Sequence, residues 1–508
     1  MSYSGILDES GLTLDRFIAI ARDNVALKLS DEVLSRIRTS RKNLEVLLKE
    51  GKPLYGINTG FGKFADVVIS DGEIAQLQLN LIRSDAVGVG NPLPREVVRG
   101  AMLLRINSLC KGFSGITENV LQTLVAMLNA HVHPVIPEKG SVGSSGDLCP
   151  LAHMVLPMLG EGEAEYKGRI MPGAEAMALA GIPVVVLSAK EGLALINGTQ
   201  IMTSVAAFAL HDAIVLAKSA DIIGALSLES LNGISDAFDP RIHDVRGQKG
   251  QMDAAANIRT LVHGSQAVTR QGEIRLQDAY SLRCLPQVHG ASRMALDYVR
   301  LVIENEINAV TDNPLVFDRD VLSGGNFHGQ PVAIAADTLG IAVAEFANIS
   351  ERRVAKLVDP ALNHGLPAFL VQRGGLNCGF MVPQYAAASL VSENKILAHP
   401  ASVDSIPTSA GQEDHVSMGT IGARKAAEIL KNVQAVLGIE WLAAAQAVDL
   451  RGKKQLGVGT TEAYELIRRH VQYLEEDRIF YKDQKTAADM IASGELLSQV
   501  EKSVGALL

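Results

Sequence analysis

The stretch QIMTSVAAFALHDAIVLAKSADIIGALSLESL, residues 200–231, decides the fold class. Its apolar side chains recur at helical spacing, which predicts one long helix. Five more stretches of this kind follow it, at residues 286–311, 332–357, 383–398, 417–448 and 460–475. They keep no strict heptad, so they are typical of a globular helical bundle rather than of an isolated coiled coil.

Shorter helical patterns precede residue 200, and loops separate them. Residues 12–50 are helical in pattern, with Asp31 as a plausible N-cap and Gly51 as a stop. Further helices are predicted at 72–83, 94–110 and 117–131. Strand-like patterns occur in GEAEYKGRIM, residues 162–171, and in PVVVLS, residues 183–188.

The change in pattern near residue 200 predicts the domain organisation. We expect a mainly α protein with a loop-rich N-terminal domain over residues 1–200 and a helical-bundle domain over residues 201–508. The longest uncharged stretch, residues 192–211, contains Asn197, Thr199 and Gln200. These polar residues favour a buried helix with a polar start over a membrane span.

Charge and cysteine content exclude several functional classes. The 508 residues carry 47 Lys and Arg against 56 Asp and Glu, a formal net charge of −9. A chain this acidic is a poor candidate for binding nucleic acid or anionic membranes. Its four cysteines stand singly, so neither a disulfide framework nor a CxxC metal pair is expected. The histidines show no metal-ligand spacing either, so we expect no metal. The single cysteines are typical of a reducing compartment, so we expect a cytoplasmic location.

Four loops place polar residues beside glycine, at 55–62, 140–149, 323–329 and 404–415. Polar loops between rigid helices commonly carry function. The segment GSVGSSGD, residues 140–147, is not a Walker loop, because no Lys follows Gly146, and it does not match the GxSxG nucleophile elbow. Taken alone, it could be an ordinary Gly/Ser turn.

The order of the motifs changes this interpretation. They are NTGFG at 58–62, GSVGSSGDL at 140–148, INGTQ at 196–200, QDAYSLRC at 277–284, DNPLVF at 312–317, GGNFHG at 324–329 and TSAGQEDHVSM at 408–418. Together they resemble the aromatic amino-acid ammonia-lyase and aminomutase family, and most closely its histidine-specific members. The resemblance runs from Tyr55 to Arg451, and seven motifs in the same order make it specific.

The resemblance implies a built-in electrophile, 4-methylideneimidazol-5-one, with no metal and no external cofactor. It would form from Ser144-Ser145-Gly146 by cyclisation and loss of water. Gly146 is required because a Cβ would block the attack of its nitrogen on the preceding carbonyl. The family's usual triad begins with Ala, but the side chain at position 144 is not consumed. The family fold is mainly α, with a loop-rich N-terminal part, a central bundle of long helices, and homotetramers whose active sites draw on three chains.

The resemblance also implies roles for single residues, each with a plainer structural alternative. Tyr55 is expected to be the catalytic base, or else a buried hydroxyl. Asn197 is expected to contact the electrophile or the substrate amine, or else to be an N-cap. Arg283 is expected to clamp the substrate carboxylate, or else to form a surface ion pair. Gln277 and Tyr280, at spacings of three, are expected to converge with it, Gln277 as a substrate-binding residue and Tyr280 as a catalytic residue.

Phe327 is expected to position the electrophile or the substrate ring, and Glu413 to bind the imidazole side chain of the substrate. The alternative is core packing for Phe327, and for Glu413 a helix-start carboxylate. We expect loops 55–66 and 140–149 and residues 277–283 to meet at one pocket.

The pair after LQLNL indicates the substrate, and here it is Ser84-Asp85. Family members that use histidine show Ser-His, those that use phenylalanine show Phe-Leu, and those that use tyrosine show His-Leu. Asp85 matches none of these. Burying an unpaired carboxylate against a benzene ring is costly, so Asp85 argues against a bulky apolar pocket. Asp85 with Glu413 therefore favours a basic or N–H-rich side chain. Histidine fits, and so does a histidine derivative or another cationic amino acid.

Three hypotheses follow from the sequence. The first is elimination of ammonia from L-histidine to give trans-urocanate. The second is the same electrophile acting as a lyase or 2,3-aminomutase on another amino acid. The third is a non-enzymatic homologue whose triad does not cyclise, which the intact Tyr55, Asn197, Arg283 and Glu413 argue against. A related class that eliminates a quaternary amine does not need the electrophile, and the intact Ser145-Gly146 makes that class less favourable.

Overall fold

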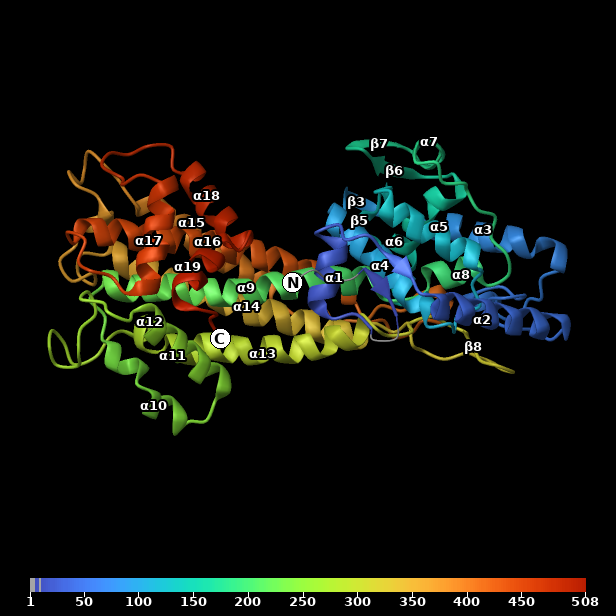
Figure 1. Ribbon diagram of the computed structural model, residues 1–508, viewed down its shortest axis with the longest axis horizontal. Coiled ribbons are helices and arrows are strands. Elements are labelled where there is room, and N and C mark those ends of the chain that lie inside the picture. The colour runs from blue at the N-terminus through green and yellow to red at the C-terminus, as the bar shows by residue number, and fades with distance from the viewer. Residues whose placement is uncertain (1–4, 9–10) are drawn as a thin grey trace. The chain divides into compact units, whose positions relative to one another are not determined.

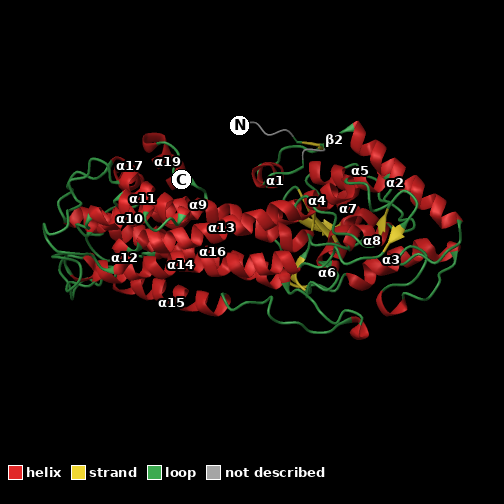
Figure 2. Ribbon diagram, turned by 90° about the horizontal axis from the view of Figure 1, so that it is seen from below, coloured by secondary structure: helices red, strands yellow, loops and turns green. Residues whose placement is uncertain are grey.

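The computed structural model describes residues 5–8 and 11–508, and it is mainly helical (Figure 2). The described residues form nineteen α-helices and nine short strands, labelled in Figure 1. This confirms the prediction of a mainly α protein.

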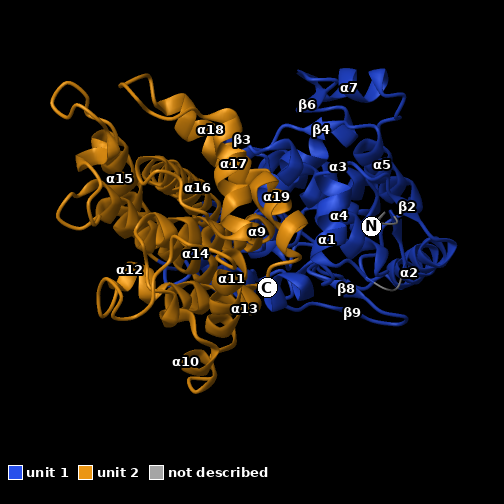
Figure 3. Ribbon diagram, turned by 60° about the vertical axis from the view of Figure 1, so that its left-hand side comes forward, with its two compact units in different colours: residues 1–208, 300–337, 400–424 blue, residues 209–299, 338–399, 425–508 orange. Residues whose placement is uncertain are grey.

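The chain divides into two compact units (Figure 3). Unit 1 contains residues 1–208, 300–337 and 400–424, and unit 2 contains residues 209–299, 338–399 and 425–508. Four of the five boundaries fall inside long helices rather than in linkers. Unit 1 therefore contains residues 201–208 and two further segments from beyond residue 200, and a domain that ends at residue 200 stays a prediction.

Eight helices lie wholly in unit 1. They are α1 (Leu14–Ala21), α2 (Asp31–Lys49), α3 (Ile74–Asp85), α4 (Arg95–Cys110), α5 (Glu118–Asn129), α6 (Leu148–Val155), α7 (Gly173–Leu179) and α8 (Glu191–Ile196). The N-cap predicted for α2 was wrong by one residue: the Ser30 hydroxyl accepts the Val33 N–H, while Asp31 occupies the first turn. Both residue types suit a helix start, so composition alone did not separate them. Gly51, at φ +72°, follows the helix end as expected.

The strands form four small sheets, all of them in unit 1. They are β1 (Ile6–Leu7) with β2 (Lys28–Leu29), β3 (Val89–Pro92) with β5 (Pro137–Lys139), β4 (His133–Pro134) with β6 (Glu163–Tyr166) and β7 (Arg169–Pro172), and β8 (Leu315–Val316) with β9 (Val321–Leu322). The β6–β7 hairpin confirms the strand pattern at 162–171. Its turn, Lys167-Gly168, has positive φ at both residues, which matches the twist of a hairpin.

The strand predicted at residues 183–188 was wrong. None of its residues pairs with a strand, and its main-chain bonds join Val185 N–H to the carbonyl of Met158 and Glu191 N–H to the carbonyl of Ser188. Val186 is 86% exposed. A short run of β-branched residues thus gave a strand pattern without a partner to form a ladder.

The long helices form the core of unit 2. The helices with residues in this unit are α9 (Gln200–Ser230), α10 (Pro240–Asp244), α11 (Lys249–Leu261), α12 (Tyr280–Arg283), α13 (Leu285–Glu306), α14 (Gln330–Val358), α15 (Met381–Leu397), α16 (Gly419–Leu450), α17 (Val458–His470), α18 (Tyr481–Ala492) and α19 (Glu495–Val504). Buried polar contacts join four of them. Arg353 of α14 and Ser227 of α9 both donate to the Glu440 carboxylate of α16, and His289 of α13 bonds Asp221 of α9. These buried hydrogen bonds join the four helices within the apolar core.

Three of these helices, α9, α14 and α16, are long and apolar enough to cross a membrane by length and composition. However, 78%, 67% and 78% of their most apolar windows is buried inside the protein. They also hold the buried charged groups Asp221, Arg353 and Glu440. Their apolar character is therefore explained by a place in the core.

Helices α3, α6 and α8 pack on one another in unit 1. Ser84 and Asp85 end α3, the glycine-rich loop 140–147 leads into α6, and Asn197 follows α8. The packing of these three helices thus brings three separate motifs to one region.

Candidate active site

The loop of residues 140–147 bends sharply at its glycines. Gly143 and Gly146 have φ of +68° and +70°, which side-chain-bearing residues rarely adopt. A Cβ on Gly146 would lie 2.2 Å from the carbonyl oxygen of Gly198. The backbone at Ser144-Ser145-Gly146 is therefore compatible only with glycine at its third position.

Asp147 anchors the end of this loop. The carboxylate is completely buried and accepts hydrogen bonds from Thr420 Oγ1, from Ser141 Oγ at 3.2 Å and from Met202 N–H at 2.8 Å. Burial raises the pKa of Asp147 to about 6, and its hydrogen bonds oppose that shift. The loop is thus tied to α16 and α9 by residues for which the motifs gave little signal, Thr420 and Met202.

Asn197 reaches the loop from the end of α8. Its side-chain nitrogen donates to Ser145 Oγ at 2.7 Å and to the Ser145 carbonyl at 3.1 Å. Its Oδ1 is buried and has no hydrogen-bond partner in the described part of the chain. Asn197 is the C-cap of α8, and its amide is directed at Ser145, so it does not serve as an N-cap.

Tyr55 lies on a loop that packs against α8. Its hydroxyl oxygen accepts the N–H of Gly62 at 3.2 Å. Gly56, at φ +64°, approaches Leu193 of α8 so closely that a Cβ would lie 2.5 Å from its side chain. The neighbouring Ile57 is fully buried in an apolar cluster with Leu44 and Val316. Tyr55 itself is half-buried.

Asp85 lies in a cavity of about 460 Å³ in unit 1. The cavity is lined by Gly60, Phe61, Phe64, Val67, Ile69, Leu77, Asn80, Leu81, Ser84 and Asp85. The Asp85 Oδ2 atom is buried without a hydrogen-bond partner among the described residues. Burial raises the pKa of Asp85 to about 6, and the charge of Glu413 raises it further, while a bond from Ser84 opposes the shift. The negative charge of Glu413 thus acts on Asp85.

Glu413 is held by its own loop. Its carboxylate accepts the Thr408 hydroxyl at 2.7 Å, and the two residues also pair through their main chains. Helix α16 begins at Gly419, six residues later, so Glu413 is not a helix-start carboxylate. The same loop contacts the Tyr55 loop, where a Cβ on Gly62 would lie 2.7 Å from Ser409 Oγ.

Phe327 is half-buried on the loop before α14. Its neighbour His328 stacks on the His415 ring at a centroid distance of 5.7 Å and donates to the His415 carbonyl at 3.2 Å. Gly329 packs on Met202 and Ser417, which a Cβ would approach to 2.5 and 3.0 Å. These contacts hold the Phe327 loop against the segment that follows Glu413.

The remaining three predicted residues belong to unit 2. Gln277 is exposed, Tyr280 is 71% exposed, and Arg283 is half-buried at the end of α12. The Arg283 guanidinium lies 4.6 Å from the Tyr280 ring centroid, and its Nε donates to the Asp278 carbonyl. Among the described residues no carboxylate forms an ion pair with Arg283. The surface ion pair is therefore not its role in this chain, and a meeting of residues 277–283 with the unit 1 loops stays a prediction.

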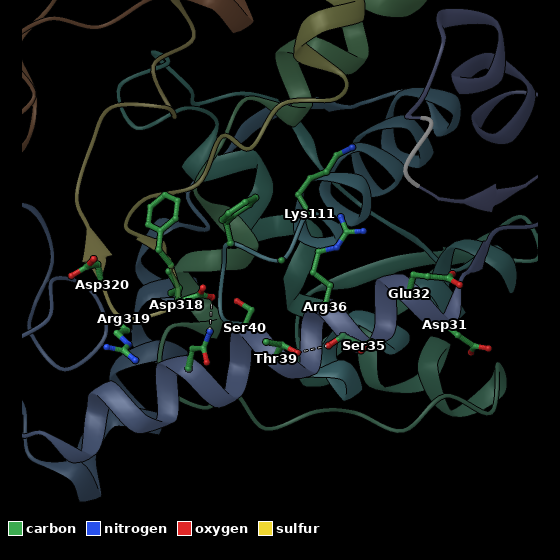
Figure 4. A pocket seen from close by; sticks show the side chains of 15 residues that line it. Asp31, Glu32, Ser35, Arg36, Thr39, Ser40, Lys111, Asp318, Arg319 and Asp320 are labelled. Carbon is green, nitrogen blue, oxygen red and sulfur yellow. Dashed lines mark hydrogen bonds between the residues drawn. The ribbon is translucent and has the colours of Figure 1, made fainter.

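Another cavity in unit 1, of about 1110 Å³, contains none of the predicted site residues (Figure 4). It lies between the first half of α2, residues 111–113 and the turn of the β8–β9 hairpin, and it carries charges of both signs. Within residues 5–8 and 11–508, no cluster of His, Cys, Asp and Glu could hold a metal ion.

Comparison with known proteins gives one consistent family. A model of aromatic amino acid lyases matches residues 12–469. Histidine ammonia-lyase 2 from Fusobacterium nucleatum is 59% identical over 504 residues, covering 99% of both chains. The solved structure of histidine ammonia-lyase from Trypanosoma cruzi is 42% identical, with a TM-score of 0.91 over 98% of this chain and 95% of that chain. Tyrosine aminomutase from Streptomyces globisporus is 36% identical, with a TM-score of 0.95 over 99% of both chains.

Proposed function

The chain belongs to the aromatic amino acid lyase family, and from that premise we propose that it eliminates ammonia from L-histidine to give trans-urocanate. The observation that carries the proposal is the hydrogen bond from the Asn197 amide to Ser145. Ser145 is the middle residue of a triad whose third residue must be glycine. The relative that shares 59% of the sequence over its full length is a histidine ammonia-lyase, which supports the same substrate.

The residues present fit a 4-methylideneimidazol-5-one made from Ser144-Ser145-Gly146. Gly146 carries no Cβ where one would clash, and Gly143 gives the bend its positive φ. The buried, unpartnered Oδ1 of Asn197 offers an acceptor next to the same atoms. The group supplies an electrophile that makes the substrate's amine a better leaving group.

Side chains of unit 1 remove the β-proton and bind the imidazole of the substrate. Tyr55 removes the β-proton, and Asn197 holds the atoms around Ser145. Asp85 and Glu413 accept hydrogen bonds from the imidazole N–H groups, which would satisfy the unpartnered Oδ2 of Asp85. Phe327 and Ser84 border the substrate side chain.

Arg283 binds the substrate carboxylate, Gln277 contacts the substrate and Tyr280 is a catalytic residue. A second subunit supplies all three within a homotetramer. Two features of unit 2 support assembly. Tyr280 and Arg283 leave polar groups available at the surface. Helix α15 leaves Val382, Tyr385 and Ile396 between 58% and 73% exposed, which is typical of helices that meet a partner. The substrate is thus a free amino acid, and we propose a cytoplasmic location with no nucleic-acid or membrane partner.

An aminomutase is the second candidate, because the tyrosine aminomutase shares the fold at a TM-score of 0.95. The carboxylates Asp85 and Glu413 do not favour it, since they suit an N–H-rich side chain rather than a phenol or benzene ring. They do not by themselves separate elimination from 2,3-migration on histidine.

Product analysis separates these possibilities. The purified protein is incubated with L-histidine, and the products are identified by mass spectrometry together with an ammonia assay. We expect urocanate and ammonia in equal amounts. A β-amino acid without free ammonia would support the aminomutase, and turnover of arginine or tyrosine but not of histidine would reject the proposed substrate.

A further inference from the structure

Arg105 is a buried charge without a bound carboxylate. It lies in α4, is fully buried, and forms no ion pair among the described residues. Burial lowers the pKa of Arg105 to about 10, and Asp312 opposes that shift. Its short hydrogen bond goes instead to a main-chain oxygen: Nη1 donates to the Asn197 carbonyl at 2.6 Å. Burying a guanidinium is costly, so this contact needs an explanation.

A second buried cation lies in the same network. Lys190 immediately precedes α8, and its ammonium donates to Asp312 at 2.8 Å, with both side chains fully buried. Burial lowers the pKa of Lys190, Asp312 opposes the shift, and Arg105 adds to it. Asp312 therefore pairs with Lys190, while its negative charge also favours the charged form of Arg105.

The segment Asn197-Gly198 lies between Arg105 and the electrophile loop. On one side, a Cβ on Gly198 would lie 2.9 Å from Arg105 Nη1. On the other side, the Gly198 carbonyl accepts the Asp147 N–H at 2.7 Å and limits position 146 to glycine. The Asn197 amide bonds Ser145 on that same side. A shift of this main chain would move both the amide donor and the support for Gly146.

We propose that Arg105 is a positioning residue for the electrophile loop: its guanidinium holds Asn197 and Gly198 against Ser145 and Gly146. The positive charge of Arg105 is separated from the loop by Asn197 and Gly198, and from there it favours negative charge that develops in the loop during cyclisation and reaction. The inference rests on the proposed function, because it concerns the same loop. A residue that only capped the end of α8 would change stability but neither loop maturation nor turnover by the folded protein.

Arg99 offers a matched control on the same helix. It is 2% exposed and donates to the main-chain carbonyls of Ala21, Ile20 and Leu128. None of these residues belongs to the candidate site. The pair R105M and R99M therefore removes a buried guanidinium from α4 with and without contact to Asn197. The second pair, R105K and R99K, keeps the charge and serves if a methionine variant does not fold.

The experiment measures intact mass, circular dichroism and steady-state kinetics on L-histidine for the parent and the four variants. A matured loop lacks two water molecules relative to the sequence. We expect part of the R105M protein to keep the unmatured mass, and kcat per total protein to fall about 100-fold, because small misplacements at a reacting centre have effects of this size. KM should change little, R105K should be intermediate, and the Arg99 variants should mature fully with parental kcat.

Two results would overturn the proposal. One is complete maturation and parental kcat in R105M, or in R105K if R105M does not fold. The other is an equal loss in the matched Arg99 variant, which would indicate a general effect of removing a buried charge. A parent that shows the mass deficit but no activity on L-histidine would reject the proposed substrate, while the mass comparison would still test Arg105. A parent without the deficit would contradict both.

Discussion

The side-chain nitrogen of Asn197 lies 2.7 Å from the hydroxyl oxygen of Ser145. The two residues are far apart in sequence, and they meet because α6 and α8 pack together in unit 1. Asn197 is buried, so this bond forms away from bulk water, where a donor has its largest effect on developing charge.

Replacing Asn197 by alanine should therefore reduce turnover sharply. We expect N197A to lose about 100- to 1000-fold in kcat, the usual effect of removing one preorganised donor. Urocanate formation under saturating L-histidine measures this loss. Retention of more than half of the parental kcat would reject the role of the amide.

The hydroxyl of Tyr55 should matter for rate rather than for folding. In Y55F the Gly62 N–H loses its acceptor, a single partly exposed hydrogen bond. Loss of a general base lowers kcat by about 100-fold or more. Thermal unfolding of Y55F should stay near that of the parent. The matched variant Y166F, on β6, should keep parental kcat, and equal activity in the two variants would remove Tyr55 from the mechanism.

Asp85 predicts a pH dependence of stability with a defined sign. Burial and Glu413 raise its pKa from 3.8 to about 6, so the folded protein holds this proton more tightly than the unfolded chain does. The resulting stabilisation is complete below pH 3.8 and is lost as the pH rises through about 6. D85N, which carries no charge, should thus unfold at a higher temperature than the parent at about pH 8, with the difference shrinking towards about pH 4.

The same variant tests substrate binding. D85N loses a charged acceptor for the imidazole N–H, so KM for L-histidine should rise, and D85H should accept histidine because it restores the family's usual pair. An unchanged KM in D85N, or a stability difference that grows towards low pH, would contradict the placement of Asp85 in the pocket.

The buried pair of Lys190 and Asp312 should be important for stability. D312N leaves the Lys190 ammonium buried without a carboxylate, and breaking such a pair costs about 3–5 kcal/mol. Denaturant unfolding measures the loss. The matched variant D318N, in the exposed β8–β9 turn, should change the free energy of unfolding by less than about 0.5 kcal/mol.

The sequence predicted the long helices because their apolar periodicity extends over many turns. It did not separate α8 from α9: residues 192–211 were predicted as one buried helix, whereas α8 ends at Ile196 and α9 begins at Gln200. It placed a strand at 183–188, where β-branched residues found no partner. Local composition thus failed where tertiary partners decide the structure.

The candidate site likewise combines residues that the motifs identified with relationships that only the fold reveals. Motifs identified Asn197, Asp85 and Glu413 one by one, but only the fold brings Asp85 and Glu413 near enough for one charge to shift the other's pKa. Arg105 carried no signal at all, since one arginine in a helix is ordinary until its burial and its bond to Asn197 are known.

One measurement tests the central claim most directly: the near-UV absorbance of the protein with L-histidine, compared with that of S145A. We predict steady growth of the urocanate absorbance in the parent and none in S145A, which cannot form the electrophile. Equal growth in both would show that elimination does not depend on Ser145. No growth in the parent, despite an intact mass that lacks two waters, would show that L-histidine is not the substrate.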